Sequence, residues 1–167
     1  ALKVLPCKAL RVLEAGSGSG VLSILLKQAN PQWQVCALEI QSHLHELAKA
    51  NATGLGLEIS LLNQDLRFYT ADKGYDCIVA NPPWQKLDCG LQSPVPERAV
   101  SRSELCCTMR DMLSFCERNL AKGGFALLLY PSGRKAEFCA ELAKRPLSLV
   151  SCLGADPNSL IFHIVKG

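Results

Sequence analysis

Two kinds of hydrophobic pattern alternate along the chain. Short apolar runs bounded by polar or turn residues are typical of buried strands, whereas apolar residues that recur every three or four positions are typical of amphipathic helices. The runs predict strands over residues 11–14, 33–40, 57–61, 75–80, 125–130, 147–153 and 160–164. The spaced positions predict helices over residues 21–29, 42–52, 105–120 and 135–144. Strand and helix therefore alternate along most of the chain.

Capping and turn residues indicate where several of these elements begin and end. The inner side of the first helix is predicted to consist of Val21, Ile24, Leu25 and Leu26. The third helix is expected to begin at Ser101 and Glu104, which have capping-box spacing, and to end at Lys122-Gly123. Residues 85–100 show little periodicity and are predicted to form a long surface loop.

The alternation of elements predicts an α/β fold with a parallel, doubly wound sheet and helices on both faces. The chain has 167 residues, so a single domain over residues 1–167 is expected. It enters a strand soon after Ala1, and we therefore expect a native N-terminal segment to be missing. In such sheets, ligands bind at the carboxyl ends of the strands, near the point where the strand order reverses.

Composition narrows the class of protein. Hydrophobic residues make up 49% of the sequence and charged residues 20%, as in a globular protein. No apolar stretch reaches the roughly 18 residues of a membrane span, and no signal peptide is recognised in residues 1–10. The nine cysteines lack Cys-x-x-Cys spacing, so neither a metal site nor a disulfide framework is expected. These features predict a cytoplasmic protein with no membrane partner.

A glycine-rich turn follows the first predicted strand. Gly16, Gly18 and Gly20 would let the backbone approach a ligand closely and expose its N–H groups. A dinucleotide fingerprint requires its third glycine at the position of Val21. Glu14, just before the turn, is unsuited to a pyrophosphate but suited to a cationic ligand.

Acidic residues end the next two predicted strands. Glu39 could accept hydrogen bonds from both hydroxyls of a ribose, and Asp65 could accept one from an adenine amino group. A ligand with adenine, ribose and a positive centre but no phosphate corresponds to S-adenosylmethionine better than to NAD. Each residue alone could be an ordinary turn glycine or strand-end acid, but their order along the chain favours the cofactor.

The fourth predicted strand runs directly into Asn81-Pro82-Pro83-Trp84. Prolines lack the N–H that a strand ladder needs, so the strand ends at Asn81 in a rigid corner. The Asn81 side-chain oxygen and the Pro82 carbonyl could hold both hydrogens of a planar NH2 group and aim its lone pair at a methyl group. Trp84 could stack on that group. Asn-Pro by itself often marks only a turn.

These motifs resemble the class I S-adenosylmethionine-dependent methyltransferases with an (Asn/Asp/Ser)-Pro-Pro-aromatic signature. The sequence is most similar to the bacterial tRNA (valine) adenine-N6 methyltransferases, in residues 13–20, 38–41 and 98–104. The resemblance implies a Rossmann-like doubly wound seven-stranded sheet, mostly parallel with an antiparallel last strand. It also implies methylation of adenine N6 in tRNA or another structured RNA. Two departures are that Trp84 replaces the usual Tyr and that the relatives' segment before the first strand is absent.

The resemblance assigns roles to individual residues. S-adenosyl-L-methionine, which becomes S-adenosyl-L-homocysteine, would be bound by Glu14, Gly16, Ser17, Gly18, Gly20, Glu39, Ile40, Asp65, Leu66 and Asn81. The catalytic residues would be Asn81, Pro82, Pro83 and Trp84. Lys86, Arg98 and Arg102 would contact RNA phosphates, although any one of them could be a solvated surface charge. A monomer is expected.

Other functions share part of this pattern. Protein glutamine methyltransferases that act on release factors carry the same signature, because a glutamine amide is also a conjugated NH2 group. Their Glu-Pro and Asp-Gly-Leu elements do not follow Trp84. DNA methylation is less favoured, because so short a chain shows no target-recognition domain. A cofactor-binding subunit without catalysis is disfavoured by the intact signature. The formal net charge of +3 is too small to indicate RNA by itself.

Overall fold

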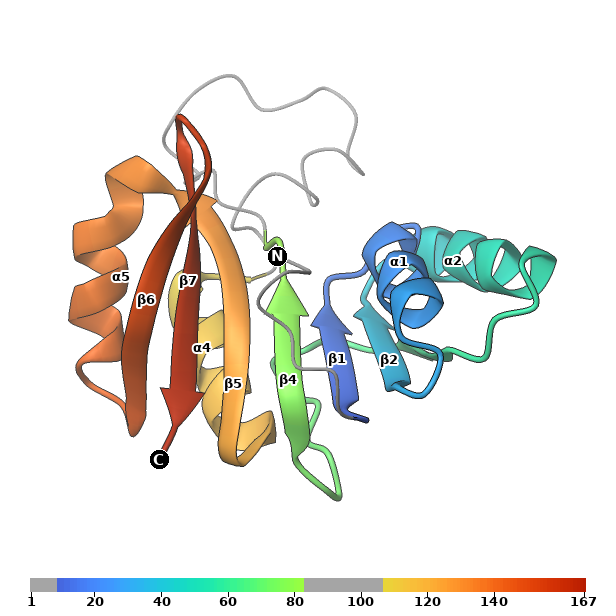
Figure 1. Cartoon of the computed structure of the whole chain (residues 1–167), viewed down its shortest axis with the longest axis horizontal. Helices are drawn as coiled ribbons and strands as arrows, with labels where there is room; N and C mark the ends of the chain where they lie inside the picture. The colour runs from blue at the N-terminus through green and yellow to red at the C-terminus, as the bar shows by residue number, and fades with distance from the viewer. Residues whose placement is uncertain (1–8, 83–106) are drawn as a thin grey trace.

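The computed structural model describes residues 9–82 and 107–167, which form one seven-stranded sheet with flanking helices (Figure 1). The strands are β1 (Arg11–Ala15), β2 (Gln34–Glu39), β3 (Ser60–Asn63), β4 (Tyr75–Ala80), β5 (Leu120–Pro131), β6 (Leu147–Asp156) and β7 (Ser159–Lys166). The helices are α1 (Val21–Ala29), α2 (Ser42–Gly54), α4 (Met109–Asn119), α5 (Lys135–Leu142) and the short 3-10 helix η2 (Ser132–Arg134).

The strand order is β3-β2-β1-β4-β5-β7-β6. The first five strands are parallel, and β7 runs antiparallel to both β5 and β6. The chain leaves β1 toward β2 and β3, then returns to place β4 on the other side of β1. The strand order therefore reverses between β1 and β4. The predicted seven-stranded, mostly parallel sheet with an antiparallel last strand is confirmed.

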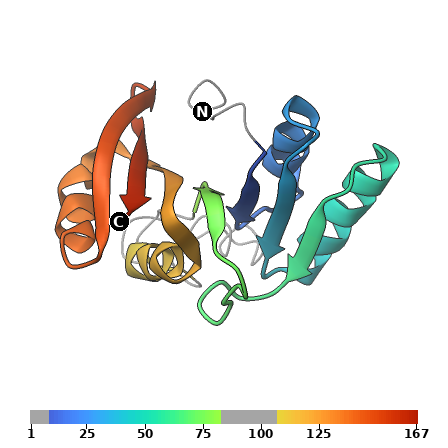
Figure 2. The same cartoon turned by 60° about the horizontal axis from the view of Figure 1, so that its bottom comes forward.

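Adjacent residues of β1 belong to different hydrophobic clusters, because successive side chains of a strand point to opposite faces. Val12 packs in a cluster with Leu26 of α1, whereas Leu13 packs in a cluster with residues of α4 and α5. Helices therefore cover both faces of the sheet, with α1 and α2 beside the β1–β3 half and α4 and α5 beside the other (Figures 1 and 2). In the described parts of the chain, none of the helices has the length and apolar character needed to cross a membrane.

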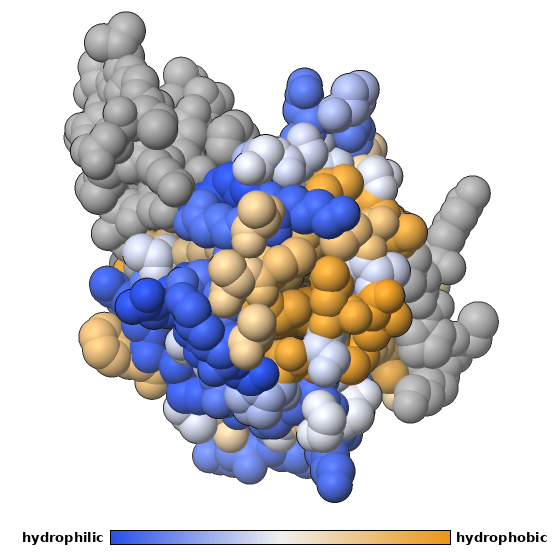
Figure 3. Space-filling model, turned by 90° about the vertical axis from the view of Figure 1, so that its left-hand side faces the viewer, coloured by the Kyte–Doolittle hydropathy of each residue, from blue (hydrophilic) through white to orange (hydrophobic). Residues whose placement is uncertain are grey.

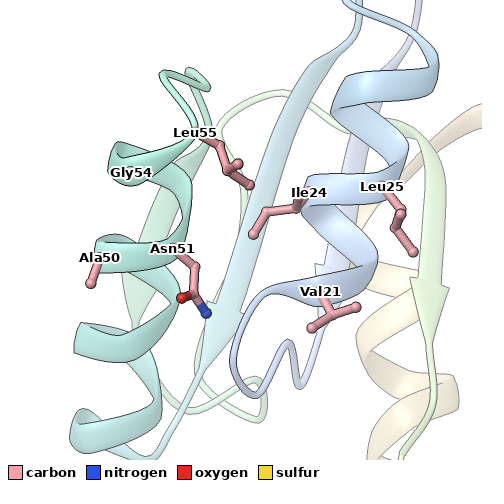
Figure 4. Close-up of a pocket in the computed structure, with 7 residues that line it drawn as sticks. All are labelled: Val21, Ile24, Leu25, Ala50, Asn51, Gly54 and Leu55. Carbon is pink, nitrogen blue, oxygen red and sulfur yellow. The ribbon is translucent and has the colours of Figure 1, made fainter.

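The buried side of α1 differs from the predicted one. Ser23, Ile24 and Leu26 are buried, but Val21 and Leu25 are 57% and 48% exposed and line a shallow groove between α1 and α2 (Figure 4). The prediction for Val21 and Leu25 was wrong. Apolar residues occur around much of this short helix, so periodicity alone could not select the side that faces the sheet.

The boundaries of α4 also differ from prediction. Its capping box is formed by Thr108 and Asp111, and it ends at Asn119, where β5 begins at once. The expected helix end at Lys122-Gly123 was wrong, because both residues lie inside β5. A Cβ on Gly124 would lie 2.8 Å from the Tyr75 carbonyl, and the pairing with β4 shifts register here. Gly124 therefore permits β5 to approach β4 closely. The expected cap at Ser101 and Glu104 lies outside the described residues.

One edge of the sheet carries exposed apolar side chains. β6 is the terminal strand, and its residues Leu149, Val150 and Leu153 are exposed hydrophobics. Figure 3 views this side of the molecule and shows apolar surface among polar side chains. β6 extends to Asp156, beyond the predicted end at Leu153, and β3 begins at Ser60 instead of Leu57.

Candidate active site

The register of the central strands places four strand ends along one edge of the sheet. Ala15 of β1 lies opposite Leu38 of β2 on one side and Ala80 of β4 on the other. Glu39, the last residue of β2, lies opposite Asn63 of β3. The predicted residues that follow these strands are therefore brought together at the carboxyl edge, at the point where the strand order reverses.

The loop between β1 and α1 depends on glycine for two different reasons. Gly16 and Gly18 have φ values of 72° and 55°, a conformation that favours glycine, and open space lies where a side chain would be. Gly20 also has a positive φ, and a Cβ there would lie 3.0 Å from the Ala48 Cβ of α2. The first two glycines keep the outer side of the loop open, and Gly20 lets the loop pack on α2.

Hydrogen bonds tie this loop to the neighbouring elements. The amides of Gly16 and Ser17 donate to the Leu38 carbonyl at 2.9 and 3.0 Å. On the α2 side, Asn51 Nδ2 donates to the Ser19 carbonyl at 3.0 Å, and Asn51 is one of the groove residues drawn in Figure 4. The loop is therefore held by β2 and α2 together. Sequence reasoning missed Asn51, because its spacing identifies it only as a polar residue of α2.

Glu39 is a buried carboxylate that is held by backbone amides. It is 5% exposed, and its Oε2 and Oε1 atoms accept hydrogen bonds from Gly18 N at 2.7 Å and from Gln41 N at 2.9 Å. Each carboxylate oxygen keeps a further lone pair that could accept a hydroxyl hydrogen. The geometry is thus compatible with the predicted ribose contact. Ile40, which follows Glu39, is 40% exposed and offers apolar surface beside it.

Asn63 supports the same strand end, a role that sequence reasoning missed. Its Nδ2 donates to the carbonyls of Glu39 and Ile40 at 2.8 and 3.1 Å, and its Oδ1 accepts a hydrogen bond from Ser42 Oγ. A single side chain therefore connects the end of β3 with the end of β2 and the start of α2. The sequence signal available for this role was that Asn63 lies just beyond the predicted third strand.

Glu14 occupies an unusual position for a carboxylate. It is 5% exposed, and its Oε2 accepts hydrogen bonds from Ser23 N at 2.8 Å and from Ser23 Oγ. Burial raises the pKa of Glu14 to about 7, while the Ser23 hydrogen bonds oppose the increase and the Glu39 charge adds to it. Near neutral pH, the Glu14 carboxyl group can therefore be protonated or ionised, and nearby charges shift the balance between the two forms.

Ser17 provides a direct indication that the loop fits a polar ligand. Its Oγ is buried and has no hydrogen-bond partner among residues 9–82 and 107–167. A buried hydroxyl without a partner is unfavourable, so a ligand group that bonds to it would gain free energy. With the open side of Gly16 and Gly18 and the carboxylates of Glu14 and Glu39, the loop suits a cationic nucleoside.

Asp65 and Leu66 follow β3 at the same edge. Arg67 Nε donates to both oxygens of the Asp65 carboxylate, at 3.1 Å to Oδ1 and 2.9 Å to Oδ2, and Nη2 donates to Oδ2 at 2.5 Å. These hydrogen bonds from Arg67 lower the pKa of Asp65 below the usual value. Leu66 is half-buried and packs against the core. An adenine amino group would have to use the lone pairs that Arg67 leaves on Asp65. Sequence reasoning did not identify Arg67 as its partner.

The corner after β4 begins as predicted. Asn81 is exposed directly after Ala80, and Pro82 is buried. Because Ala80 lies opposite Ala15, Asn81 follows the strand beside the glycine loop. The other predicted catalytic and substrate residues, Pro83, Trp84, Lys86, Arg98 and Arg102, lie outside the described residues.

The fold and the glycine loop define a Rossmann-like α/β methyltransferase domain. A family model described as "Methyltransferase small domain" matches residues 2–104. The chain therefore belongs to this family of S-adenosylmethionine-dependent methyltransferases.

Curated relatives have two kinds of named activity. The tRNA1(Val) (adenine(37)-N6)-methyltransferase of Aeromonas hydrophila is 29% identical over 166 residues, which cover 94% of this chain and 69% of that protein. The release factor glutamine methyltransferase of Enterococcus faecalis is 30% identical over 105 residues, which cover 59% and 38%. A second tRNA1(Val) enzyme, from Dyadobacter fermentans, is 26% identical, and the match covers 80% and 55%. This chain thus matches only part of each relative's length.

Solved structures share the fold. The structure of TrmN from Thermus thermophilus has a TM-score of 0.71 and 23% identity, covering 95% of this chain and 44% of that chain. The ribosomal protein L11 methylase of Lactobacillus delbrueckii has a TM-score of 0.74 and 19% identity, covering 99% and 75%. The magnesium protoporphyrin IX methyltransferase of Synechocystis, solved with bound S-adenosylmethionine, has a TM-score of 0.69 and 19% identity, covering 99% and 74%.

Proposed function

We propose that this domain transfers a methyl group from S-adenosylmethionine to the N6 amino group of an adenine in structured RNA, with tRNA as the expected class. The observation that carries the proposal is the position of Asn81. It is exposed at the end of β4, and β4 pairs with the strand that leads into the glycine loop. A methyl acceptor held by Asn81 would therefore face a cofactor held by that loop.

The cofactor side of the site is assigned to residues with suitable geometry. Glu39 holds the ribose hydroxyls, and Asp65 holds the adenine amino group. The open side of Gly16 and Gly18 accommodates the ligand, and Ser17 Oγ gives it a hydrogen bond. When bound, S-adenosylmethionine supplies a methyl group activated by the positive sulfur.

Asn81 and Pro82 act on the target amino group. The nitrogen of an adenine amino group is conjugated with its ring and is therefore a poor nucleophile. Two acceptors, the Asn81 side-chain oxygen and the Pro82 carbonyl, bind its two hydrogens, favour a pyramidal nitrogen and stabilise the positive charge that develops during transfer. Pro82 is buried, and its ring restricts the backbone φ angle directly after Asn81. The adenine must leave its stack to reach them.

The choice of RNA is supported by the extent of the similarity. The match to the Aeromonas tRNA enzyme covers 94% of this chain, whereas the match to the Enterococcus release factor enzyme covers 59%. Lys86, Arg98 and Arg102, which follow Asn81-Pro82-Pro83-Trp84 in the sequence, are assigned to phosphate contacts, since cationic side chains suit a nucleic acid.

A second candidate is N5 methylation of a glutamine in a protein. A release factor glutamine methyltransferase of Streptococcus pneumoniae is 39% identical over 75 residues, or 45% of this chain. A glutamine side chain presents the same planar NH2 group, so Asn81 and Pro82 serve either substrate equally well.

A competition between substrates tests the choice. The protein is incubated with methyl-labelled S-adenosylmethionine and, in separate reactions, total tRNA, a release factor or duplex DNA, and the products are identified by mass spectrometry. N6-methyladenine in tRNA is the expected product. N5-methylglutamine in the release factor would establish the second candidate instead, and N6-methyladenine only in DNA would exclude both.

A further inference from the structure

The hydrogen bonds to Glu14 are distributed unevenly between its two oxygens. Both the backbone amide and the hydroxyl of Ser23 bond to Oε2, although Ser23 lies nine residues further along the chain on the first turns of α1. Within the described parts of the chain, no hydrogen bond reaches Oε1. Ser23 is itself fully buried. The arrangement fixes the orientation of the carboxyl group and leaves one oxygen available to a ligand.

We infer that Ser23 is a positioning residue that couples cofactor binding to proton release. By holding Oε2, it presents Oε1 of Glu14 to the cationic amino-acid end of S-adenosylmethionine, and the proton that Glu14 carries in the free protein passes to solvent when the cofactor binds. This inference rests on the proposed function, because it concerns the same cofactor site.

The surroundings of Glu14 favour the protonated form of its carboxyl group near neutral pH. Its neighbours in the sheet are apolar, with Ala37 opposite it on β2 and Val79 opposite it on β4. The first turn of α1 carries no acidic residue, and Lys27 in its last turn donates instead to the carbonyls of Pro31 and Trp33. Glu39 is the charged side chain that acts on Glu14 from within the described residues, and its negative charge favours the protonated form.

A bound cation changes this balance. A positive group within a few ångströms favours the ionised carboxylate and opposes both burial and the Glu39 charge. With a pKa of about 7 in the free protein, roughly half of the Glu14 carboxyls carry a proton at pH 7. Cofactor binding should then release about half a proton at that pH, and the affinity should rise about tenfold between pH 6 and pH 8.

Calorimetric titration with S-adenosylmethionine measures both quantities. Dissociation constants are determined from pH 5.5 to 9, and the proton count is obtained from heats in two buffers that differ in ionisation enthalpy. Glu14→Gln provides the reference, since it cannot titrate and so reports the titration of the cofactor's own amino group. The difference between wild type and Glu14→Gln isolates Glu14.

Three substitutions at position 23 separate positioning from packing. Ser23→Ala removes the hydroxyl, Ser23→Cys keeps the volume but offers only a weak donor, and Ser23→Thr retains the hydroxyl. Loss of a hydrogen bond that favours the ionised form should raise the pKa of Glu14. In the Ala and Cys variants, the increase of cofactor affinity with pH should therefore occur at higher pH. Binding should be about fivefold to tenfold weaker at pH 7 and equal to wild type by pH 9. Ser23→Thr should follow the wild-type profile. Ser148→Ala, on exposed β6, is the matched control.

The outcomes distinguish the inference from the proposed function. A wild-type profile that matches Glu14→Gln, with no proton released, would overturn the inference while cofactor binding stands. Ala and Cys variants that bind more weakly by the same factor at every pH would show that Ser23 only packs. If neither variant folds, the proton count and the Ser23→Thr profile still decide the question. An absence of binding at every pH would remove the proposed function and the inference with it.

Discussion

The amide of Gly18 donates a 2.7 Å hydrogen bond to Glu39 Oε2, which joins the loop after β1 to the end of β2. Glu39 therefore shapes the loop before any ligand arrives. The same carboxylate is assigned to the ribose, so one side chain both organises the cofactor site and forms part of it. Preorganisation of this kind reduces the entropy lost on binding.

Replacing Glu39 should weaken cofactor binding. Glu39→Ala removes the acceptor of both ribose hydroxyls and the hydrogen bond from Gly18, so the dissociation constant for S-adenosylmethionine should rise about 10-fold to 100-fold. Calorimetry measures the change. Glu46→Ala, which removes an exposed carboxylate from α2, should leave the constant unchanged. An unchanged constant in Glu39→Ala would refute the assigned role.

Replacing Asn81 should affect transfer and leave cofactor binding intact. Asn81→Ala removes one acceptor for the target amino group, so the transfer rate should fall by about 100-fold to 1,000-fold while cofactor affinity stays within about twofold. Asn81→Asp retains an acceptor at that position and should lose less activity. Single-turnover methylation and calorimetry on the same samples separate the two effects. Equal losses of rate and affinity would contradict the proposal.

Gly20 should be the costliest of the loop glycines to replace. An alanine there combines a left-handed backbone conformation with a Cβ placed 3.0 Å from Ala48 Cβ. Gly20→Ala should therefore lower the free energy of unfolding by about 2 to 3 kcal/mol. Gly56→Ala has a similar positive φ but open space around it, so it should lose only about 1 kcal/mol. Urea unfolding compares the two variants, and equal losses would show that packing on α2 contributes nothing.

Glu14 should make the stability of the ligand-free protein depend on pH. Its pKa is raised in the folded protein from 4.5 to about 7, so the folded state binds this proton more tightly than the unfolded chain does. The stability that results is complete below about pH 4.5 and is lost as the pH rises through about 7. Glu14→Gln stays neutral. Its free energy of unfolding relative to wild type should therefore rise by up to about 3 kcal/mol between pH 5 and pH 8.5. A constant difference across this range would show that Glu14 is ionised throughout.

Asn119 should be important for the segment between β3 and β4. Its buried side chain accepts a hydrogen bond from Ala71 N at 2.8 Å, while its Nδ2 donates to Phe115 O at 3.0 Å and to Tyr69 O at 3.3 Å. Asn119→Ala leaves the Ala71 amide and the Tyr69 carbonyl without this partner, while the Phe115 carbonyl keeps its helical hydrogen bond. The variant should lose about 2 to 4 kcal/mol of unfolding free energy. Asn158→Ala, at an exposed turn, should change it by less than about 0.5 kcal/mol. Thermal and urea unfolding measure both variants, and a loss as small as that of Asn158→Ala would contradict the role.

Local features of the sequence were sufficient to predict the fold class. Alternating periodicities identified the strands and helices, and prolines and glycines marked most turns, although Lys122-Gly123 lies inside β5. The residues expected in the site follow strand ends, so a parallel sheet brings them to one edge whatever the details of packing. This is why Gly16, Glu39 and Asn81 could be selected without coordinates.

Tertiary structure decided the contacts between residues that are distant along the chain. The pairing of Glu14 with Ser23, the bonds from Asn119 to the segment before β4 and the side of α1 that faces the sheet depend on how crossovers place one element on another. Hydrophobic periodicity shows only which sides of a helix are apolar. Because α1 is apolar on several sides, periodicity could not identify the side that packs on the sheet. The sequence by itself thus determined which residues lie at the ends of strands. The fold determined which buried polar groups pair there, because each such group must find a partner within hydrogen-bonding distance.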